Sequence, residues 1–71
     1  MYANLIDSLK RKGISMNAAA AAAGMPEATF RTKAQDRSFY FEEAMTIKRN
    51  LFPEMDIMFL FEKTQEPNPN S

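Results

Sequence analysis

The chain has 71 residues, with nine basic and nine acidic side chains and a formal net charge of zero. It contains no cysteine and no histidine, which excludes disulfides and thiolate chemistry and removes the commonest metal ligand and general base. The sequence therefore predicts one small domain with no catalytic residues, no metal site and no cofactor, and an enzyme is not expected.

Neither a membrane span nor a secretory leader is expected. No apolar run reaches the roughly 20 residues needed to cross a bilayer. The opening segment, Met1-Tyr-Ala-Asn-Leu-Ile-Asp7, lacks the basic region and apolar core of a signal peptide. We therefore expect a cytoplasmic protein that makes no membrane contact.

In chain order, three helices are predicted in the first half. Asn4 is expected to cap the first helix, with Asp7 three residues later and Gly13 just past its end. A second helix is predicted from about residue 16 to residue 23, after the N-cap Ser15. A third is predicted from Pro26 to about Gln35, because proline is favoured at a helix start.

Two further helices and a tail complete the prediction. The fourth helix carries an apolar face that includes Phe41 and ends before Pro53. Phe30, Phe41 and Phe52 are assigned to the core. Asp56 is expected to cap a short fifth helix. Residues 64–71 are polar and proline-rich, and we expect them to form a disordered tail, which leaves residues 1–63 as the domain.

The second and third predicted helices have the layout of a helix-turn-helix motif. A small residue, Ala20, stands where the two helices would cross, and Gly24 stands where a left-handed turn is needed. Met25 and Phe30 would then enter the core from the turn and from the third helix. The spacing therefore predicts a helix-turn-helix.

The chemistry on this motif does not favour DNA. Helices that read DNA bases usually present Arg, Gln or Asn to the major groove. Here the outward residues at the start of the third helix are Pro26, Glu27 and Ala28, and the side chains suited to DNA contact come later, as Arg31, Lys33 and Gln35. Since DNA-binding domains are usually clearly basic, a net charge of zero also argues against DNA binding.

Aromatic and acidic residues suggest a protein-binding surface instead. Phe39, Tyr40 and Phe41 are consecutive at a helix start, so they cannot all point into one small core, and residues 57–61 are all apolar. Acidic side chains lie beside the predicted motif, at Glu27, Asp36, Glu42 and Glu43. They have two compatible interpretations: attraction to a basic partner, or, for the three glutamates, favourable placement in first helical turns.

The chain resembles a family of small lambda-repressor-like proteins of temperate phages, the Cro and immunity-repressor type. The resemblance covers nearly the whole chain and rests on the order and spacing of several short segments: Met1-Tyr-Ala-Asn-Leu5, Lys12-Gly-Ile-Ser15, Gly24, Phe39-Tyr-Phe-Glu-Glu-Ala44, Leu51-Phe-Pro-Glu-Met-Asp-Ile57 and Leu60-Phe-Glu-Lys63. Within this type, the chain looks most like an antirepressor that acts with the phage's immunity repressor.

The resemblance implies an all-α, compact five-helix lambda-repressor-like helix-turn-helix domain with a role in the phage genetic switch. As an antirepressor in the bacterial host cell, the chain would bind the immunity repressor, a helix-turn-helix protein, and block operator binding, which favours lytic growth over lysogeny. The partner-binding surface predicted from the residues is the third helix with the start of the fourth: Glu27, Ala28, Arg31, Thr32, Gln35, Phe39, Tyr40, Glu42 and Glu43.

Two alternative functions in transcription regulation stay open. One is a Cro-type regulator that binds DNA as a homodimer, with Arg31, Lys33 and Gln35 as the DNA contacts. The other is a corepressor that joins the repressor on DNA. In the main interpretation, DNA binding by this chain is weak or occurs only jointly with the repressor.

Overall fold

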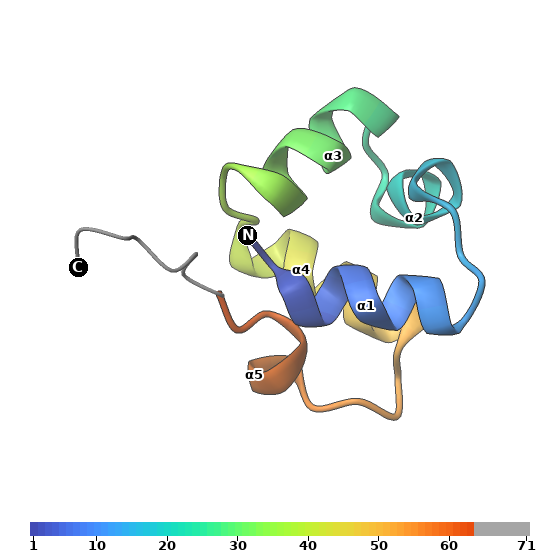
Figure 1. The fold of residues 1–71 in the computed structure, drawn as a ribbon, viewed down its shortest axis with the longest axis vertical. Coiled ribbons are helices and arrows are strands. Elements are labelled where there is room, and N and C mark those ends of the chain that lie inside the picture. Colours follow the sequence, from blue (N-terminus) through green and yellow to red (C-terminus); the bar gives the residue numbers. More distant parts are fainter. Residues whose placement is uncertain (64–71) are drawn as a thin grey trace.

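The computed structural model describes residues 1–63, and every regular element in that range is a helix (Figure 1). The helices are α1 (Ala3–Arg11), α2 (Met16–Ala23), α3 (Glu27–Gln35), α4 (Phe41–Leu51) and α5 (Ile57–Leu60). In the view of Figure 1, α2 and α3 lie above α1 and α4, and the short α5 lies below them. The predicted all-helical class is confirmed, while the tail predicted over residues 64–71 lies outside the described residues.

One apolar core lies between the helices. Its largest fully buried side chains come from four helices and from the turn after α4: Leu5, Phe30, Ile47, Phe52 and Leu60. The alanine-rich α2 packs against α3 and α4, and its Ala19 and Ala20 are buried. Because helix separation depends on the side chains at the contact, these alanines allow α2 to approach its neighbours closely. The core positions predicted for Phe30 and Phe52 are confirmed.

The two ends of α2 are closed by local hydrogen bonds. The Ser15 side chain accepts a hydrogen bond from the Ala18 N–H at 3.0 Å, as predicted for an N-cap. At the other end, Gly24 has φ +72°, and the Met25 N–H donates to the Ala20 carbonyl at 3.0 Å in a Schellman motif. This short turn leads into α3, as a helix-turn-helix requires, but the motif itself stays a prediction.

The predicted cap of α1 is wrong. The helix begins at Ala3, with Tyr2 as its N-cap residue, and Asn4 lies inside the helix. Tyr2 takes the cap position because its ring is buried and its N–H donates to the Ala34 carbonyl at 3.0 Å. Asn4 instead donates through Nδ2 to the Phe59 carbonyl at 2.9 Å, which ties α1 to α5.

The predicted core position of Phe41 is also wrong, because 74% of this residue is exposed. Phe41 is the first residue of α4, and Ala44, one turn later, is buried. The four-residue α5 lies opposite this end of α4 without covering it, so Phe41 remains at the surface. Ile47 takes the core position further along α4.

No helix within residues 1–63 is both long enough and apolar enough to cross a membrane.

The turn between α2 and α3 supplies a stability prediction. Space around a side chain added at Gly24 is open, so a substitution there costs only the backbone penalty of a positive φ. We expect Gly24→Ala to lower the free energy of unfolding by about 1 to 2 kcal/mol, and Gly24→Asn by less, because asparagine tolerates this conformation better. Urea denaturation measures both values, and an equal cost for the two variants would contradict a purely conformational cause.

Candidate protein-binding surface

The predicted contact residues of α3 lie on one face of that helix. Glu27, Arg31 and Gln35 follow one another at four-residue spacing, with Ala28 and Thr32 beside them, and all five are exposed. The structure therefore brings these five predicted residues together on one accessible surface, which we call the α3 face.

Arg31, the strongest candidate for base contact on the α3 face, is paired within the helix. Its Nη2 lies 2.6 Å from Glu27 Oε2, one turn earlier. Both side chains are about half exposed, so the pair contributes only a few tenths of a kcal/mol to stability. The pairing still offsets the one positive charge that Arg31 brings to this surface.

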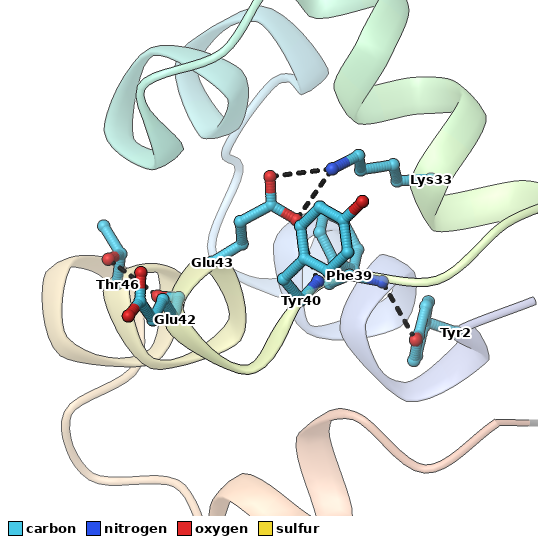
Figure 2. Close-up of polar contacts among 7 residues, drawn as sticks. All are labelled: Tyr2, Lys33, Phe39, Tyr40, Glu42, Glu43 and Thr46. Atoms are coloured by element: carbon cyan, nitrogen blue, oxygen red, sulfur yellow. Dashed lines mark hydrogen bonds and ion pairs between the residues drawn. The ribbon is translucent and has the colours of Figure 1, made fainter.

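Lys33 does not belong to the α3 face. Its side chain is half-buried and reaches toward the start of α4, where Nζ donates to both carboxylate oxygens of Glu43 at 2.7 and 2.8 Å (Figure 2). The same Nζ lies 4.5 Å from the centre of the Tyr40 ring, a cation–π distance. Sequence reasoning missed this pairing, since nothing in the local sequence relates Lys33 to Glu43.

Glu43 holds the start of α4 in place. In addition to the ion pair with Lys33, its Oε1 accepts a hydrogen bond from the Tyr40 N–H at 2.9 Å. Partial burial raises the pKa of Glu43, but the hydrogen bonds from Lys33 and Tyr40 and the charge of Lys33 outweigh this effect and lower the pKa below its usual value. Glu43 is thus engaged inside the chain, and its contact with a partner stays a prediction.

The three consecutive aromatic residues divide between the interior and the surface, as expected for three neighbours at a helix start. Phe39 is half-buried, with its ring centre 5.3 Å from that of Tyr2 and 5.4 Å from that of Phe30. Its N–H donates to the Tyr2 hydroxyl at 3.2 Å (Figure 2). Tyr40 and Phe41 are each 74% exposed, but Tyr40 lies beside Lys33 of α3, whereas Phe41 faces α5.

Glu42 differs from its neighbour Glu43. Its side chain is exposed, and it has no ion-pair partner within residues 1–63. Glu42 contacts Thr46 through its backbone carbonyl, which accepts a hydrogen bond from the Thr46 hydroxyl at 2.9 Å (Figure 2). The Glu42 carboxylate is therefore available to a partner.

A groove between α4 and α5 joins Phe39, which belongs to the predicted contact set, to residues that the set omitted. It has a volume of about 740 Å³ and is lined mainly by apolar side chains: Phe39, Phe41, Ala44, Ile57, Met58, Phe59, Phe61 and Glu62. The signal in the sequence was the apolar run over residues 57–61. In the structure Leu60 takes the core position, and Met58 and Phe59 remain 78% and 51% exposed.

Among residues 1–63, no group of three or more histidine, cysteine, aspartate or glutamate side chains is placed to hold a metal ion. Comparison with protein-family models, curated proteins and solved structures finds no match to this chain. The surface chemistry of the chain is therefore the basis on which its function is inferred.

The Glu43 carboxylate gives a pH-dependent stability prediction. Because folding lowers its pKa, the unfolded chain takes up the proton first as pH falls. The stabilisation is complete above the unfolded-state value of about 4.3 and is lost as pH drops through the lower folded-state value. We expect Glu43→Gln to cost about 1 kcal/mol at neutral pH, and the difference from wild type to shrink below about pH 4.

Glu42→Gln is the matched control for this experiment, because Glu42 lies in the same helical turn and its carboxylate has no ion-pair partner in the described part of the chain. Urea denaturation at a series of pH values should give a smaller and flatter effect for this variant. A pH-independent cost at Glu43 would contradict the assigned charge interaction.

Proposed function

We propose that the chain is a phage antirepressor that binds a helix-turn-helix repressor and prevents it from occupying its operator. The observation that carries the proposal is that basic side chains of α3 are paired with acidic side chains of the same chain. Arg31 is paired with Glu27, and Lys33 is paired with Glu43, so two of the three side chains proposed for DNA contact have acidic partners within the chain.

This arrangement is poorly suited to DNA. Affinity for DNA comes mainly from basic side chains that neutralise phosphates, and a net charge of zero with internally paired cations provides little of that attraction. The half-buried Lys33–Glu43 pair would have to open before Lys33 met a phosphate, whereas the exposed Arg31–Glu27 pair would open at little cost. The arrangement favours a protein partner over an operator and weighs against the Cro-type alternative.

The same surface suits a basic protein. The DNA-reading face of a repressor is positively charged, and an exposed Glu42 beside an exposed Tyr40 offers a negative charge next to an aromatic anchor. Aromatic residues that become buried at the centre of an interface contribute most of the affinity, whereas rim charges act mainly on the association rate. We propose that the α3 face and Tyr40 cover the repressor's DNA-reading surface, so that operator and antirepressor compete.

The first functional prediction concerns DNA. We expect the isolated chain to show no sequence-selective operator binding at physiological salt, and to release a repressor from its operator when added to the complex. A gel-shift titration with a helix-turn-helix phage repressor and its operator measures both. Selective binding by the chain alone would favour the Cro-type alternative, and a slower-migrating complex of both proteins on DNA would favour the corepressor.

The second functional prediction concerns the interface. We expect Tyr40→Ala and Arg31→Ala to weaken repressor binding by up to roughly thirtyfold, which corresponds to about 2 kcal/mol, with Tyr40→Ala the larger effect. Calorimetry gives the affinities, and circular dichroism checks that each variant remains helical.

Two variants serve as controls. Arg11→Ala removes a comparable exposed pair, Arg11 with Asp7 at 2.9 Å, from α1, and should leave binding unchanged. Tyr40→Phe keeps the ring and should retain most of the affinity. Unchanged affinity for both Tyr40→Ala and Arg31→Ala would place the interface elsewhere on the molecule.

A further inference from the structure

The groove between the start of α4 and α5 is separate from the α3 face. Its exposed apolar lining residues are Met58, Phe41 and Phe59, and Tyr40 does not line it. Large apolar side chains gathered around one depression are costly to leave in water, and such patches usually mark contact sites. Methionine adds adaptability, because its unbranched side chain fits differently shaped partners.

The groove presents mainly apolar side chains to an occupant, and the backbone of Phe59 on its wall is already hydrogen-bonded. The Phe59 carbonyl already accepts a hydrogen bond from Asn4 at 2.9 Å, and the Phe59 N–H is bound to Asp56 at 3.0 Å. An extended peptide would bury backbone groups here without partners, which is unfavourable. A helix satisfies its backbone internally, so an amphipathic helix is the peptide form that this apolar groove suits.

The charged residues around the groove determine which amphipathic helices it favours. Glu62 is the charged residue that lines it, and Glu42 adjoins the lining residue Phe41. The neighbouring cation, Lys63, is directed to the Ser38 hydroxyl and lies 5.6 Å from the Tyr2 ring centre. An occupant with basic residues beside its apolar face would therefore find complementary charge on the groove's edge.

Two other occupants fit less well. A second copy of the chain related by a twofold axis would bring Glu42 and Glu62 of both copies to the same interface, which adds like charges. The segment after Lys63, Thr64-Gln-Glu-Pro-Asn-Pro-Asn-Ser71, has no aliphatic or aromatic side chain larger than proline to fill an apolar groove.

We propose that this groove binds an amphipathic helix of a partner protein, one whose apolar face is flanked by lysine or arginine. The inference goes beyond the proposed function, because it assigns a second surface and stands whether or not the α3 face covers a repressor.

Synthetic peptides added to the full chain test this assignment. The probe is a helical peptide of about 16 residues, roughly four turns, with leucine at i, i+4 and i+7 positions and lysine on the flanks. One control peptide has the same composition with the leucines spread around the helix, and a second has glutamate in place of every lysine. Calorimetry measures affinity, and amide chemical shifts locate the site.

We expect the basic amphipathic peptide to bind at least about tenfold more tightly than either control, with shifts centred on Phe41, Met58 and Phe59. Phe41→Ala and Met58→Lys alter exposed side chains, so both variants should fold and should weaken binding by about tenfold or more. Tyr40→Ala, equally exposed but outside the groove, should leave peptide binding unchanged. That variant separates this inference from the proposed function, which predicts that Tyr40 governs repressor binding.

Three results would overturn the assignment. One is equal affinity for the basic and acidic peptides, and another is chemical shift changes centred on the α3 face. The third is a dimer of the chain in sedimentation equilibrium that Met58→Lys dissociates, which would give the groove to a second copy.

Discussion

The α3 face and the groove between α4 and α5 are both positioned by the contacts of the buried residue Tyr2. Its backbone N–H binds the Ala34 carbonyl at the end of α3, and its hydroxyl accepts the Phe39 N–H just before α4. Its ring also packs against Phe39 and against Phe61, whose ring centre lies 5.8 Å away. One residue at the start of the chain thus joins the end of α3, the start of α4 and the segment after α5.

This junction explains why the aromatic residues at the start of α4 divide as they do. With Phe39 held against Tyr2, Phe30 and Phe61, the chain enters α4 with the next two side chains directed away from the core. Tyr40 is then beside α3, where its ring meets the Lys33 ammonium, and Phe41 is beside α5, where it lines the groove. Burial of one aromatic residue therefore places its two neighbours on different surfaces.

Local signals in the sequence predicted the elements well and the long-range contacts poorly. Ser15, Gly24 and Asp56 act on backbone within a few residues of themselves, so the ends of their helices could be predicted. The cap at Asn4 failed because burial of Tyr2, which depends on residues more than 30 positions away, moved the helix start. No periodicity in the sequence contains that information.

In the candidate site, too, contacts within one helix could be predicted and contacts between helices could not. The five exposed residues of the α3 face follow from helical spacing alone, and so they could be predicted. The pairing of Lys33 with Glu43 crosses from one helix to the next, so helical spacing within one element did not reveal it. The position of Phe41 depends on how far the four-residue α5 extends, which apolar patterning does not specify.

The internal pairing of charge has a consequence for any partner of this chain. A cation already held by a carboxylate, as Lys33 is at 2.7 Å in a half-buried setting, gains little from a phosphate, because the existing pair must be broken first. A carboxylate such as Glu42, which has no ion pair within residues 1–63, can attract a basic surface without any such loss. The fold thus pairs Arg31 and Lys33 with carboxylates of its own and leaves Glu42 without an ion pair within residues 1–63. On a shared helical fold, what the molecule can bind depends on such surface charges more than on the helices themselves.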